Sequence, residues 1–384
     1  MSADKAKKAH EPLFHVVKRN SMPLWKAWLI RLAAVLAALV VCGIIIVTVT
    51  GENPFAMYKT MFVGAFGTTR RRWSLLQDLA MLLCISLAVT PAFKMKFWNI
   101  GAEGQVLIGG LATASCMILM GDKVSPYVLY PVMIITSMLA GALWAVIPAI
   151  FKAKWNTNET LFTLMMNYIA IQLLSYFSFI WSNPKGSGKI GIINASSHAG
   201  WLPQIGGNKY LFNLLVVLAI TIFMYVYLKY SKHGYELAVV GESENTARYA
   251  GINVKKVIIR TMLLSGAICG IAGLLLVAGA NHTVSSNAAD GRGFTAIMVS
   301  WLAKFNPIFM ILTSLLLVFL DKGATEISTT FSLNDSFSEI LSGIIIFFII
   351  GCEFFINYKI KFREKAKPAP AAEPQSVEKE GEGS

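Results

Sequence analysis

The chain has 384 residues, of which 55% are hydrophobic and only 14% are charged, and its mean hydropathy is +0.58. Soluble domains carry about a quarter charged residues, so this composition excludes an ordinary water-soluble globule. The net charge of +13 resides in short Lys- and Arg-rich segments beside apolar runs, and no basic surface suited to nucleic acid is evident. The composition predicts an all-α integral membrane protein in a lipid bilayer.

Apolar runs of suitable length recur along the chain, since a helix of about twenty residues crosses ~30 Å of hydrocarbon. The first run follows basic residues but is too long for the core of a signal peptide, so we expect it to remain as a span. Clear spans are expected at 28–50, 73–93, 104–120, 126–150, 159–182, 210–230, 257–279 and 338–356.

The stretch 294–320 is ambiguous, because a Lys-Phe-Asn-Pro interruption at 304–307 divides it into two short apolar pieces. Two broken helices there give ten transmembrane helices, whereas one kinked helix gives nine. Basic segments at both ends of the chain predict cytoplasmic termini, which require an even number. We therefore expect about ten spans, with discontinuous helices near 97–104 and 290–307. The arginines at 70–72 fall outside in this topology and depart from the positive-inside rule.

The predicted organisation has three parts: a cytoplasmic segment at 1–27, a transmembrane domain at 28–357, and a disordered cytoplasmic tail at 358–384 that is rich in Lys, Glu, Pro and Ala. A polar cytoplasmic loop lies at 231–256. The connections leave no room for a soluble catalytic domain, so we do not expect an enzyme.

Polar residues at a predicted helix break and inside one span are candidates for a solute path. Glu103 and Gln105 fall in the first turn of a helix, whose positive end favours an anion, and Asn167 lies within a span. Irregular backbone in a membrane must face protein or a water-filled cavity. The alternative is that these groups only cap helices and hold them together. The candidate pathway residues are Asn99, Glu103, Gln105, Asn158 and Asn167.

The loop at 231–256 contains the pattern of a short helix with both ends capped. Ser243 suits the N-cap, Glu244 and Arg248 match the helix dipole, and Gly251 suits the position after the helix. Such capping, together with small residues, favours a helix parallel to the membrane that docks onto a partner. The candidate residues that couple this chain to such a partner are Gly241, Glu242, Ser243, Ala247, Arg248, Tyr249 and Gly251.

Motifs for nucleotide hydrolysis and metal binding are lacking. The run at 186–189 resembles part of a phosphate loop, but the required first glycine and the residue after the lysine are wrong. The glycines at 291–296 follow no predicted strand. We therefore expect no catalytic residue, metal ion or cofactor in this chain.

Four segments taken together resemble the branched-chain amino acid, simple-sugar and nucleoside group of ABC permeases, and most closely its nucleoside-type members. They are Asn99–Gly104, Asn158–Tyr168, Val240–Ile252 and Gly291–Ala296, and Trp98 stands where Phe is usual. The resemblance covers roughly 28–357.

The resemblance implies the membrane-spanning permease subunit of an ATP-driven importer in the bacterial cytoplasmic membrane. It further implies uptake of a nucleoside, ATP bound by a separate ATPase subunit, a second permease subunit, and an extracellular solute-binding lipoprotein. One alternative is a simple-sugar, ribose-type permease. Another is an ion-coupled secondary transporter, which would need carboxylates in mid-span; the acidic residues here lie mostly near span ends.

Overall fold

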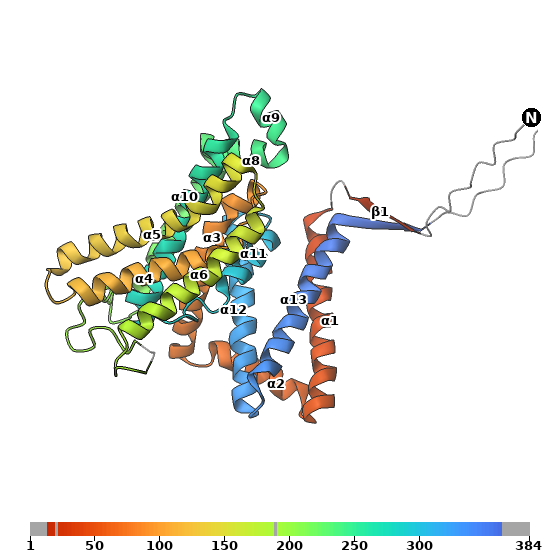
Figure 1. The fold of residues 1–384 in the computed structure, drawn as a ribbon. Helices are drawn as coiled ribbons and strands as arrows, with labels where there is room; N and C mark the ends of the chain where they lie inside the picture. Colours follow the sequence, from red (N-terminus) through yellow and green to blue (C-terminus); the bar gives the residue numbers. More distant parts are fainter. Residues whose placement is uncertain (1–13, 20–21, 188–189, 363–384) are drawn as a thin grey trace, which may run out of the picture. The chain divides into compact units, whose positions relative to one another are not determined.

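The structure is a computed structural model that describes residues 14–19, 22–187 and 190–362. Figure 1 shows that helices make up most of this part of the chain. The residues form two compact units, one within Met1–Val40 and Phe347–Ser384, and a larger one at Val41–Ile346. The expected all-α membrane class is confirmed.

Side-chain caps define where many of the helices begin. Among the described helices, eight start at an Asn, Ser or Thr whose side chain accepts a backbone N–H of the first turn. In chain order the helices are α1 (Leu24–Thr50), α2 (Pro54–Phe66), α3 (Thr69–Lys94), α4 (Ala102–Met120), α5 (Pro126–Trp155), α6 (Glu159–Ile180), α7 (Leu211–Tyr230), α8 (Lys232–Glu242), α9 (Glu244–Tyr249), α10 (Val254–Leu274), its π-helical extension η1 (Leu275–Asn281), α11 (Arg292–Leu302), α12 (Pro307–Thr330) and α13 (Asp335–Asn357).

Nine helices within the described residues are long and apolar enough to cross a membrane. They include all eight clear spans expected from the sequence. The ambiguous stretch is interrupted as expected, between α11 and α12. However, α12 has 24 residues and is itself a full span, whereas α11 has 11 residues and a length of only about 16 Å. The expected pair of short helices is therefore corrected to one half-length helix and one complete span.

The direction of α11 follows from its contacts with α3. Arg292 at the start of α11 pairs with Asp78, and Ser300 eight residues later donates to the carbonyl of Ser86 at 3.0 Å. Both residue numbers rise together along the two helices, so α11 runs parallel to α3.

Helix α2 was not expected from the sequence. It supplies a hydrogen-bond acceptor for Arg71, one of the three arginines that depart from the positive-inside rule. The guanidinium of Arg71, at the start of α3, donates to the α2 carbonyl of Val63 at 3.2 Å and pairs with Glu326 of α12. An ion pair lowers the cost of placing a cation at this position.

Glycines allow α4, α5 and α10 to approach each other closely. A Cβ on Gly270 would lie 2.1 Å from the carbonyl oxygen of Ser137, and one on Gly141 would lie 2.2 Å from that of Gly266. Small residues are the usual means of close helix packing in membranes, where burial of apolar surface contributes little. These three helices pack against one another within the larger unit.

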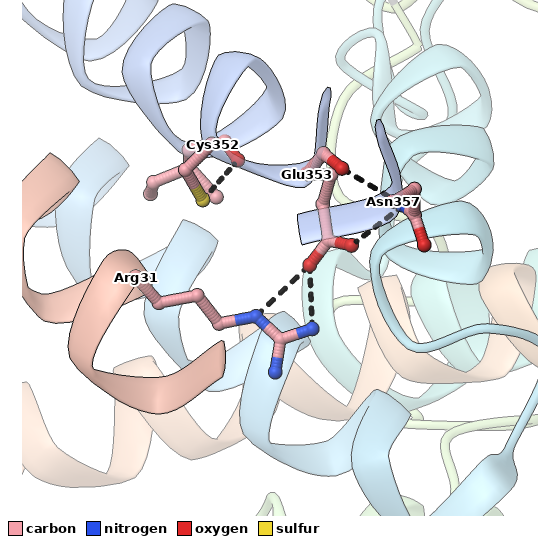
Figure 2. A network of polar contacts seen from close by, with 5 residues as sticks. Arg31, Cys352, Glu353 and Asn357 are labelled. Atoms are coloured by element: carbon pink, nitrogen blue, oxygen red, sulfur yellow. Dashed lines mark hydrogen bonds and ion pairs between the residues drawn. The ribbon is translucent and has the colours of Figure 1, made fainter. Parts of the chain in front are cut away.

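In the smaller unit, α1 and α13 are joined by an ion pair that Figure 2 shows. The Nε of Arg31 donates to Glu353 at 2.9 Å, and the Asn357 side chain donates to the Glu353 carbonyl at 2.8 Å. Beyond the helices, β1 (Phe14–Lys18) pairs with β2 (Tyr358–Phe362) in an antiparallel ribbon. The segment expected to be a disordered tail therefore begins with a strand; its remainder, from 363, lies outside the described residues.

Candidate functional site

The break between α3 and α4 is stabilised by the side chain of Asn99, which is fully buried. Its Oδ1 accepts the backbone N–H of Gly101 and the side-chain amide of Gln105, both at 3.1 Å. Its Nδ2 donates to Ser265 Oγ of α10 at 3.3 Å. A turn inside a membrane leaves backbone groups without helical hydrogen-bond partners. The Asn99 side chain provides such a partner for the N–H of Gly101.

Helix α6 supplies the other partners of the same break. Asn167 accepts the Gly104 N–H at 2.8 Å and donates to the Ile100 carbonyl at 2.9 Å. Thr163 accepts the Ile100 N–H at 3.2 Å. Asn158 lies apart from these groups, at the exposed start of α6, where it accepts the Leu161 N–H as an N-cap.

Glu103 connects the two helix breaks that the sequence predicted separately. Its carboxylate accepts the Gly291 N–H at 3.0 Å and the Gly293 N–H at 2.7 Å. The carboxylate thus caps the positive end of α11 from a different helix. A Cβ on Gly293 would lie 2.6 Å from the Glu103 nitrogen, so only glycine permits this approach. We call residues 95–104 and 290–293 the helix-break joint.

A cluster of charged side chains lies beside the joint and was missed in the sequence. Asp78 of α3 binds Arg292 at 2.9 Å and Lys322 of α12 at 2.6 Å. The signal was present, because Asp78 interrupts an apolar run nine residues after the start of α3. A charge in that position usually has a partner inside the protein.

The structure brings together four of the five candidate pathway residues, and Asn158 is the exception. The four are buried, with exposures of 7% or less, and their hydrogen bonds serve the joint. The Oε1 atom of Gln105 alone among their side-chain oxygens and nitrogens is buried without a partner in the described residues. Their role in a solute path stays a prediction, and it would require the joint to open.

The expected short helix in the polar loop is present as α9. Ser243 Oγ accepts the Thr246 N–H at 3.3 Å, and Arg248 pairs with Glu244 at 3.4 Å. Gly251 follows the helix with φ +76°. The structure adds α8, which the sequence did not predict and which carries Gly241 and Glu242 at its end.

The residues expected to contact a partner differ in their exposure. Ala247 is fully buried within this chain, whereas Tyr249 is 93% exposed. The small side chain of Ala247 thus permits packing of α9 onto its own chain. Gly241 makes a second close approach, since a Cβ there would lie 2.2 Å from the Lys94 carbonyl oxygen. Beside this contact, the end of α8 and the start of α9 line a hollow of about 180 Å³ together with residues 95–97, Lys152 and Glu159.

Long apolar helices, a half-length helix capped in mid-bundle, and an exposed capped helix on a polar loop define a polytopic membrane permease. Residues 72–350 match the family described as branched-chain amino acid transport system / permease component. The chain belongs to this family, and the expectation of an ABC permease subunit is confirmed.

Curated relatives match over nearly their full lengths. A glucose ABC transporter permease protein of Haloferax volcanii is 31% identical over 92% of this chain and 95% of the relative. A guanosine ABC transporter permease protein of Bacillus subtilis is 30% identical over 87% and 94%. A nucleoside ABC transporter permease protein of Lactococcus lactis subsp. cremoris is 28% identical over 88% and 94%.

Proposed function

We propose that this permease carries a nucleoside into the cell as part of an importer driven by ATP. Support comes from the two relatives named for guanosine and nucleoside transport, and from the four segments that resemble nucleoside-type permeases. The glucose permease of Haloferax volcanii, at similar identity, makes a sugar the alternative solute. A sugar and a nucleoside share hydroxyl groups, and only the nucleoside has a planar base.

Competition for uptake separates the two solutes. Cells that express the complete importer are given a labelled nucleoside together with an excess of unlabelled nucleoside, ribose or glucose. The proposal requires competition by nucleosides and none by the free sugars. Uptake of labelled glucose that nucleosides do not reduce would replace the nucleoside with a sugar.

The observation that carries the transport proposal is the position of α9, an exposed capped helix on a chain with no nucleotide-hydrolysing motif. We assign α9 as the contact for a separate ATPase that binds the ATP, with Tyr249 as its protruding residue. Aromatic side chains at such positions often dominate binding energy. Gly241 then transmits movement of α8 to the end of α3, next to the joint, through its contact with Lys94.

Co-purification tests this contact with a matched pair of tyrosines. Tyr249→Ala should reduce recovery of the ATPase with the permease in mild detergent, while Tyr127→Ala should not. Tyr127 is 90% exposed at the start of α5, at the opposite end of that helix from Lys152, which lines the hollow beside α8 and α9. Equal recovery with both variants would contradict docking at Tyr249.

The remaining features of the proposal concern topology and partners. Because α11 runs parallel to α3, residues 282–302 provide a return across the membrane in addition to the nine long helices. Ten crossings put both termini on the same side of the membrane. The basic segments near both ends support the cytoplasm as that side, and reporter fusions at the two ends should both report it. A second permease subunit and an extracellular solute-binding lipoprotein complete the proposed importer in the cytoplasmic membrane of a bacterium.

A further inference from the structure

One exposed face of α6 carries polar and aromatic side chains in regular order. Tyr168, Gln172 and Tyr176 follow each other at intervals of four residues, so they share one side of the helix. Tyr168 is 57% exposed and Tyr176 is 61% exposed, and Gln172 between them is exposed as well. Together with Ile169 and Leu173 they line a hollow of about 370 Å³.

Other helices of the larger unit expose a different kind of surface. The exposed large side chains in the middle of α5 and α7 are aliphatic or phenylalanine. For α5 they are Ile134, Ile135, Leu139, Leu143 and Ile147, and for α7 they are Leu215, Leu218, Ile222, Phe223 and Val226. These two surfaces suit lipid chains. The α6 face, with an amide and two phenols in the same zone, does not.

An amide in contact with lipid chains is costly, because its hydrogen-bonding groups have no partner there. Within the residues that the structure describes, the Gln172 side chain has no hydrogen-bond partner. Polar groups within a membrane face other protein or a water-filled cavity. In the working transporter this face of α6 therefore contacts other protein or borders a water-filled cavity.

We propose that this face of α6 is a wall of the solute path that recognises the nucleobase; the inference rests on the nucleoside transport proposed above. Gln172 presents one acceptor and two donors, which match the polar edge of a base. The rings of Tyr168 and Tyr176 offer flat surfaces for stacking. Between Thr160 and Ile180 the helix carries no charged residue, which suits an uncharged solute.

The spacing of the three side chains gives the wall its mode of action. Neighbouring positions lie about 6 Å apart along the axis, and the tyrosines about 12 Å apart. Two rings at that separation are too far apart to hold one base between them. Each tyrosine instead stacks on the base in turn, and Gln172 binds its edge during the passage. Weak successive contacts allow release, which a path fed by a binding protein requires.

Thiol labelling of the complete importer in proteoliposomes tests whether the face meets water and solute. Gln172→Cys is compared with Leu218→Cys, a position 52% exposed on α7, and with the unmodified chain, whose five cysteines are buried. A thiol ionises readily only in water, and the thiolate is the form that reacts. A membrane-impermeant reagent should therefore label Gln172→Cys at least about tenfold faster than Leu218→Cys. A nucleoside should slow that labelling, and free ribose should not.

The outcomes are distinct. Equal, slow labelling of both variants would mean that lipid or another subunit covers the face. Rapid labelling that no solute slows would mean that the face does not contact the base. Either result overturns the proposal. If the importer accumulates glucose and not nucleosides, and glucose protects Gln172→Cys, the wall stands but the base recognition and the proposed function fail. In a second readout, Gln172→Leu should lower nucleoside uptake about three- to tenfold through one lost hydrogen bond, with the ATPase still bound.

Discussion

Replacing Glu103 with Gln tests the role of the helix-break joint. The carboxylate accepts two backbone N–H groups, at 3.0 and 2.7 Å, and its charge faces the positive end of α11. Gln presents only one acceptor, and its NH₂ group faces the other N–H. Loss of one hydrogen bond to a charged group costs about 1.5–3 kcal/mol, and loss of the interaction with the dipole adds about 0.3–1 kcal/mol. We expect the free energy of unfolding to fall by about 2–4 kcal/mol.

The assay is thermal unfolding of the purified permease in detergent, with Glu52→Gln as the control. Glu52 is an exposed carboxylate between α1 and α2, so the same chemical change there should leave the melting temperature unaltered. Equal melting temperatures for Glu103→Gln and the control would refute the joint as described. Uptake measured in parallel decides the pathway prediction, because a solute contact would lower uptake beyond the loss of folded protein.

Three further changes follow from other contacts. Asp78→Asn should lower stability by about 2–4 kcal/mol in the same melting assay, because it leaves Arg292 with little exposure and no carboxylate partner. Gly270→Ala should reduce the yield of folded protein, since overpacking costs about 1–3 kcal/mol and the new Cβ would meet the Ser137 carbonyl. The hydrogen bond from Arg260 lowers the pKa of Glu236, so its contribution to stability should be present at neutral pH and lost as the pH falls below about 4; a Glu236→Gln variant should show a flatter profile.

Periodicity and capping rules were sufficient for much of the fold. The long spans were predictable because about twenty consecutive apolar residues have one stable form in a bilayer. The α9 helix was predictable because Ser243 and Gly251 act on their own neighbours in sequence. Both signals are local, and the structure agrees with them.

Contacts between distant residues were not predictable from one sequence. Glu103 could be placed at the start of a helix, but nothing local indicates that it caps α11, whose glycines lie 188 and 190 positions away. Ala247 could be recognised as a close-packed position, yet the sequence does not distinguish packing within the chain from contact with a partner. Helix α2 was missed because its 13 residues are too few for a span and carry no charged first turn.

Accumulation of a labelled nucleoside in proteoliposomes tests the central claim most directly. The vesicles contain this chain with its ATPase, second permease and binding protein, and ATP is supplied on the cytoplasmic side. The account predicts that the nucleoside accumulates against its gradient only when ATP is hydrolysed, and that proton and sodium ionophores have no effect. Accumulation that continues without ATP and stops when an ion gradient is removed would contradict the account and identify an ion-coupled transporter.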